Sequence, residues 1–94
     1  MASAAKTFSD DGGAFEVDGT ERVHTLRTPG GLVSNTSLVD FVIHPWGAAI
    51  SSLTDPVPPP CLPVPAGSSA RLPPQSLSFS AKAGAQAFGV LTKG

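Results

Sequence analysis

Apolar and polar residues alternate in several short segments of the chain, which is the pattern of half-buried strands. In residues 76–82 each apolar residue is flanked by serine or lysine, and residues 14–18 show the same alternation. Residues 38–44 are instead rich in β-branched and aromatic residues, as expected of a central strand. Further short strands are predicted at 69–72 and 85–92.

A tight turn separates the first of these strands from the next polar–apolar segment. Asp18 and Gly19 lie between residues 14–18 and residues 21–28. Asp-Gly is favoured in two-residue hairpin loops because both of its positions tolerate positive φ. The sequence therefore predicts a hairpin between 14–18 and 21–28.

The turn-forming residues decide the fold class. Glycine and proline each supply 10 of the 94 residues, so long helices are not expected, and the length allows one small domain. We predict an all-β fold over residues 14–94, a small antiparallel β-sandwich or barrel of about six to seven short strands. Residues 1–13 are small and polar with Phe8 as their large apolar anchor, and are predicted to form an extended N-terminal arm.

Prolines are concentrated between residues 54 and 67, where six of the ten occur. Proline fixes φ and has no N–H for a sheet, so this segment is predicted to cross the surface as polyproline II. Its P-x-x-P spacings, Pro56 to Pro59 and Pro60 to Pro63, leave a second interpretation open. In that interpretation the prolines dock into an aromatic groove of a partner.

Charge argues against several classes of partner. Six Lys and Arg against seven Asp and Glu give a net charge of −1, and the basic residues are scattered along the chain, so nucleic-acid binding is not predicted. The longest mostly apolar run, 38–53, is too short to span a bilayer, and the first residues lack the apolar core of a secretion signal. Only 14% of the residues are charged, which indicates that much of the surface meets other protein.

The residue types of catalytic and metal sites are present without the spacing that such sites need. His24, His44 and Cys61 form no metal-binding motif, and no base is placed to activate the single thiol. We therefore predict no catalytic residue, no metal and no cofactor, and hence no enzyme.

Five residues are the predicted contacts with a partner. Trp46 stands between proline and glycine, and is either a core residue beneath a loop or an anchor at an interface. The complete set comprises Phe8, Trp46, Pro58, Pro59 and Pro60.

The last third of the chain resembles a known group of proteins. Residues 62–72, with a Val-Pro-Ala-Gly-Ser turn that leads into a strand, are followed by two segments rich in Ser, Ala and Val at 76–81 and 85–91. This pattern is similar to the C-terminal half of small β-sandwich structural proteins of tailed bacteriophage virions. Such families include capsid decoration (cement) proteins and proteins of the neck, tail or fibre base.

The resemblance implies a protein of the virion, made in the host cytoplasm. It implies binding to the major capsid protein or another virion protein, often as a trimer or other homo-oligomer, with an extended terminal arm. We therefore expect a capsid decoration protein, with a neck, tail or fibre-base protein as the first alternative. A free-standing β-sandwich that binds peptide or carbohydrate is the second.

Overall fold

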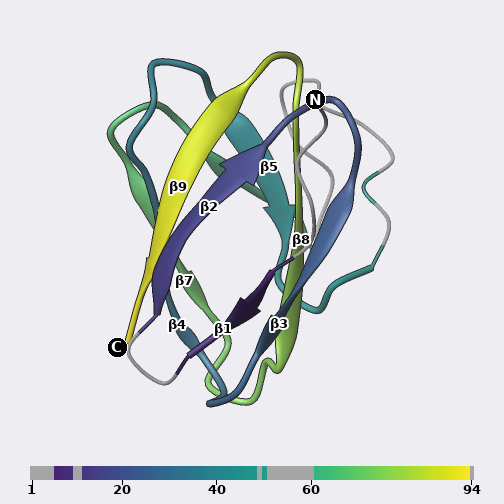
Figure 1. The fold of residues 1–94 in the computed structure, drawn as a ribbon, viewed down its shortest axis with the longest axis vertical. Helices are drawn as coiled ribbons and strands as arrows, with labels where there is room; N and C mark the ends of the chain where they lie inside the picture. The colour runs from purple at the N-terminus through teal and green to yellow at the C-terminus, as the bar shows by residue number, and fades with distance from the viewer. Residues whose placement is uncertain (1–5, 10–11, 49, 51–60, 94) are drawn as a thin grey trace.

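The computed structural model describes residues 6–9, 12–48, 50 and 61–93. Within these residues the chain forms nine strands and no helix, so the all-β prediction is confirmed (Figure 1). The strands are β1 (Thr7–Phe8), β2 (Gly13–Val17), β3 (Arg22–Leu26), β4 (Gly31–Asn35), β5 (Phe41–His44), β6 (Leu62–Val64), β7 (Ser69–Leu72), β8 (Ser78–Ala83) and β9 (Ala87–Thr92).

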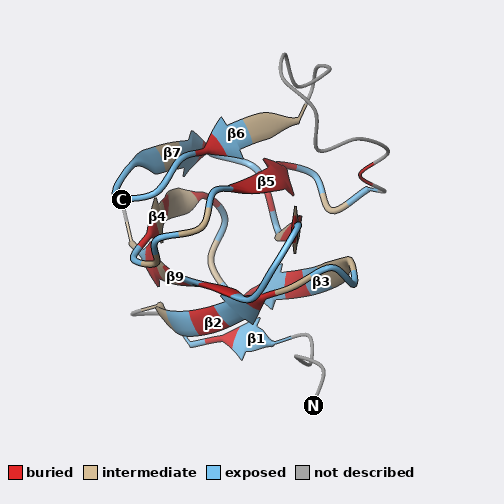
Figure 2. Ribbon diagram, turned by 90° about the horizontal axis from the view of Figure 1, so that it is seen from above, coloured by how far each residue is buried: buried red, intermediate tan, exposed pale blue. Residues whose placement is uncertain are grey.

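The strands form two sheets that face each other as a sandwich. One sheet has five strands in the order β1-β3-β8-β5-β6, and the other has four in the order β2-β9-β4-β7. Apart from β5 and β6, strands that follow each other in sequence lie in different sheets. Buried and exposed residues alternate along β2 and β3, as expected for strands with one inward face (Figure 2).

The hairpin predicted between 14–18 and 21–28 is wrong. β2 pairs with β9, and β3 pairs with β8 in the other sheet. The Asp18 carboxylate accepts the Thr20 N–H at 2.9 Å, and the Asp18 carbonyl accepts the Ala83 N–H at 2.9 Å. Gly19 does not take the positive φ of a two-residue hairpin turn, so the chain crosses to the opposite sheet instead of reversing.

Aromatic rings join the two sheets. The Phe15 ring of β2 lies 5.3 Å from the Phe79 ring of β8 in an edge-to-face arrangement, and 6.1 Å from the Phe41 ring of β5. A Cβ on Gly89 of β9 would lie 2.5 Å from the Phe15 ring, so glycine is required beside it. The sandwich therefore depends on Phe15 and on the space that Gly89 leaves.

The segment assigned to an N-terminal arm contributes a strand to the domain. β1 pairs in parallel with β3, and Phe8 is 1% exposed, with its ring 5.8 Å from Phe15 and 5.9 Å from Phe79. Phe8 is thus a core residue, and its predicted contact with a partner is wrong. Residues 1–5 and 10–11 of the expected arm lie outside the described residues.

The proline-rich crossover ends in a strand. β6 pairs with β5 at the edge of the five-stranded sheet, with Pro63 opposite Val42. An edge tolerates proline because one side of the strand needs no N–H donor. Polyproline II was expected through residue 67, so the prediction is wrong over β6. Residues 54–60 lie outside the described residues.

Replacement of Phe8 tests whether the N-terminal strand is part of the fold. Phe8→Ala removes a ring packed against two others, and should lower the free energy of unfolding by about 3 kcal/mol or more. Thr7→Ala, at the exposed neighbour on the same strand, is the matched control and should change it little. Urea unfolding measures both variants. Equal midpoints for Phe8→Ala and the parent chain would contradict a core position.

Candidate functional site

Trp46 lies in a tight loop that leaves β5. The side chain of His44, the last residue of β5, accepts the Trp46 N–H through Nδ1 at 3.2 Å, and its carbonyl accepts the Gly47 N–H at 3.1 Å. Gly47 has φ +76°, and a Cβ there would lie 2.5 Å from the Ser78 hydroxyl. The loop therefore packs closely on β8, and the glycine is required both by its φ and by the contact.

Serine hydroxyls attach this loop to β8 and to the turn before it. They pair in chain order, each donating to a loop carbonyl: Ser76 to Pro45, Ser78 to Trp46 (3.5 Å) and Ser80 to Ala48. Ser76 and Ser80 are fully buried beneath the loop. The serine face of the strand predicted at 76–82 is therefore covered, and its hydroxyls hold the loop backbone.

The loop presents Trp46 at the surface. Half of the Trp46 side chain is exposed (50%), and Val23 of β3 is also exposed (43%). The position of a Cβ on Gly47 is 3.5 Å from Val23, so the loop and Val23 are neighbours. We call Val23 and Trp46 the Trp46 patch. Trp46 is thus an exposed aromatic on a fixed loop, with an apolar neighbour.

Leu77 does not lie where the alternation of residues 76–82 predicts. It was expected to share the buried face of Phe79 and Ala81, and the structure leaves it 55% exposed. β8 begins only at Ser78, so Leu77 belongs to the turn before the strand. The alternation of buried and exposed residues therefore does not extend to Leu77.

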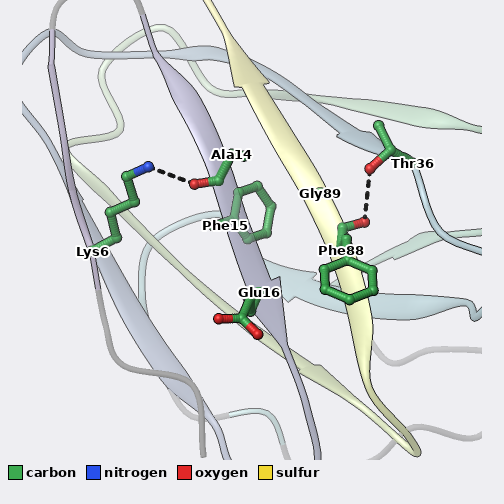
Figure 3. Close-up of a pocket in the computed structure, with 7 residues that line it drawn as sticks. All are labelled: Lys6, Ala14, Phe15, Glu16, Thr36, Phe88 and Gly89. Carbon is green, nitrogen blue, oxygen red and sulfur yellow. Dashed lines mark hydrogen bonds between the residues drawn. The ribbon is translucent and has the colours of Figure 1, made fainter.

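A second candidate surface lies over β2 and β9 (Figure 3). It is a depression of about 500 Å³ beside Phe88, which is 49% exposed. Lys6 Nζ donates to the Ala14 carbonyl at 2.6 Å, and the Glu16 carboxylate accepts from the Gln86 side chain at 3.1 Å. Both charged groups already have partners, so Phe88 is the group that an apolar ligand would contact.

His24 is a core residue. Its ring is fully buried, 5.1 Å from the rings of Phe15 and Phe79, and its Nδ1 accepts the Lys6 N–H at 3.1 Å. Its Nε2 has no hydrogen-bond partner in the described part of the chain. Burial, followed by the charges of Lys6 and Arg22, lowers the pKa of His24 to about 4. The ring is therefore neutral at neutral pH.

Cys61 has the environment of an unactivated thiol. It is partly exposed, and burial together with the nearby Glu21 carboxylate raises its pKa. A raised pKa lowers the thiolate fraction, which is the opposite of what a nucleophile needs. Among the described residues, no three His, Cys, Asp or Glu side chains are grouped so that they could hold a metal ion. None of the described segments is a helix long and apolar enough to cross a membrane.

The structure places the five predicted contact residues in different settings. Trp46 is accessible and Phe8 is in the core, while the prolines Pro58, Pro59 and Pro60 lie outside the described residues. Sequence reasoning missed Leu38, which is 97% exposed, because it was assigned to a strand at 38–44. The available signal was its position in a polar turn directly after Asn35-Thr36-Ser37.

Comparison with protein-family models, with curated proteins and with solved structures finds no match. The function must therefore be inferred from the chain's own surfaces. Among them, the Trp46 patch combines an exposed aromatic side chain with a fixed backbone.

The depressed pKa of His24 makes stability depend on pH. Between the unfolded value of 6.5 and the folded value of about 4, the unfolded chain binds a proton that the folded protein does not. His24 should therefore stabilise the fold fully above pH 6.5, and the stability should decrease by on the order of 3 kcal/mol as the pH falls through this range. Observing the His24 ring by NMR titration measures its pKa directly. Titration near 6.5 in the folded protein would contradict this environment.

Proposed function

We propose that this protein is a non-enzymatic structural subunit of a virus particle, a capsid decoration protein that binds the major capsid protein. The observation that carries the proposal is Trp46, half exposed on a loop held by serine hydroxyls. Tryptophan, with tyrosine and arginine, is enriched among the side chains that contribute most of the binding energy of protein interfaces. A backbone that is already fixed loses little entropy when a partner covers it.

The low charge supports an interface of this kind. Only 14% of the residues are charged, and Val23, Leu38, Leu77 and Phe88 are large apolar side chains exposed in addition to Trp46. Such a surface is favourable where protein covers it and unfavourable in a free monomer. Many copies bound to one lattice would add avidity to a small contact.

Copy number distinguishes decoration from other positions in a particle. The test is quantitative mass spectrometry of particles produced from the genome that encodes this chain. A decoration protein is expected at hundreds of copies per particle. A few to a few dozen copies would indicate the neck, tail or fibre base instead, and absence from purified particles would overturn the virion proposal.

A second candidate function rests on the depression beside Phe88. The volume of the depression and the half-exposed Phe88 ring fit an apolar side chain of a peptide. This candidate corresponds to a free-standing β-sandwich that binds peptide. Carbohydrate is less favoured, because sugar sites use platforms of several aromatic rings and this chain has no Tyr and one Trp.

Two matched variants separate these candidates. Trp46→Ala and Phe88→Ala each remove a half-exposed aromatic ring, from the loop and from the four-stranded sheet respectively. Decoration through the Trp46 patch predicts that Trp46→Ala lowers occupancy on particles about tenfold or more, while Phe88→Ala leaves it unchanged. The reverse result would assign binding to the depression beside Phe88. Thermal unfolding of both variants controls for loss of fold.

A further inference from the structure

Leu38 is presented by a loop that one buried side chain fixes on both sides. Asn35 is 2% exposed, and its Oδ1 accepts the backbone N–H of Ser37 at 2.9 Å and its hydroxyl at 2.7 Å. Its Nδ2 donates to the carbonyls of Val39 and Val64, each at 2.8 Å. Leu38 lies between these fixed points and is 97% exposed. Leu38 is therefore a solvent-exposed leucine on a fixed backbone, and it does not contribute to the core of its own chain.

A carboxylate accompanies Leu38 on the same loop. Asp40 is exposed, and its Oδ1 accepts the Ala66 N–H at 2.8 Å, so its position is also fixed. The end of the sandwich beyond β4 therefore presents an apolar side chain and, two residues later, a negative charge. We call residues 37–40 the Leu38 loop.

The opposite end of the sandwich has a cleft of complementary character. Its volume is about 240 Å³, and the exposed residues Pro29 and Pro74 contribute apolar surface to it, while Leu72 lies beneath it in the core. Arg71 and Lys93 also line it, and bring two positive charges. Arg71 is exposed on β7, so the cleft offers a cationic contact together with the two prolines.

The Leu38 loop and this cleft lie at opposite ends of β4. Gly31, the first residue of β4, lines the cleft, and the Leu38 loop follows Asn35, the last residue of β4 (Figure 1). When successive copies keep the same direction, a contact between these two ends leaves one free loop and one free cleft, to which further copies can add.

We infer that copies of this chain associate head to tail, with the Leu38 loop of one copy in the cleft of the next. Leu38 contacts the surface of Pro29 and Pro74, and Asp40 faces Arg71 and Lys93. We take a second copy as the partner because this one chain carries both matching surfaces. The Leu38 loop supplies an apolar side chain and a negative charge, and the cleft supplies apolar surface and positive charges. The association uses neither the Trp46 patch nor the depression beside Phe88, so it stands independently of the proposed function.

Sedimentation velocity on the full chain tests this contact. The parent protein should form species larger than a dimer as its concentration rises. Leu38→Ser and, separately, Arg71→Glu should each weaken association about tenfold or more. Leu77→Ser is the matched control, because Leu77 is also an exposed leucine and lies outside both surfaces. It should assemble like the parent chain.

Mixing the two defective chains identifies the contact as head to tail. Leu38→Ser keeps an intact cleft, and Arg71→Glu keeps an intact Leu38 loop, so a one-to-one mixture should form dimers and stop there. A mixture that stays monomeric, a parent chain that is monomeric at all concentrations, or a Leu38→Ser variant that assembles normally would overturn the inference. Leu38→Ser should unfold at the same temperature as the parent chain. If Arg71→Glu does not fold, Lys93→Glu is used in its place.

Discussion

The packing of Phe79 against Phe15 joins the two sheets, and the strand that carries Phe79 organises most of what surrounds it. β8 is the middle strand of the five-stranded sheet, and its Phe79 ring contacts Phe8, Phe15 and His24. These contacts account for the incorporation of the N-terminal strand, since Phe8 packs against both Phe79 and Phe15. These rings add to the hydrophobic core of a domain whose short length limits how much surface it can bury.

The opposite face of β8 positions the candidate site. Ser80 neighbours Phe79 in sequence and points away from the core, where its hydroxyl and that of Ser76 hold the carbonyls of the loop that carries Trp46. One strand therefore fixes the core on one side and a surface aromatic on the other. The proposed binding role needs this link, because an anchor on a loose loop would lose affinity to the entropy of ordering it.

The sequence allowed prediction of the fold class and of several strands, and left their pairing open. Alternation along 76–82 identified β8 because the period of a strand is local. The partner of β2 could not be read from Asp18 and Gly19, because the choice between a hairpin and a crossing depends on which distant strand covers each face. Phe8 was misassigned for the same reason, since its burial depends on β2, β3 and β8 together. The sequence left Trp46 as either a core residue or an anchor, and its exposure in the structure excludes the core position.

The proposed role of Trp46 requires that the backbone around it is fixed before any partner binds. Amide hydrogen exchange resolved by NMR tests it at Trp46 and Gly47, whose N–H groups donate to His44. Both amides should exchange many-fold more slowly than those of an unstructured chain, and Ser80→Ala should accelerate their exchange while β9 stays protected. Exchange at the rate of an unstructured chain in the parent protein, with β8 still protected, would contradict it.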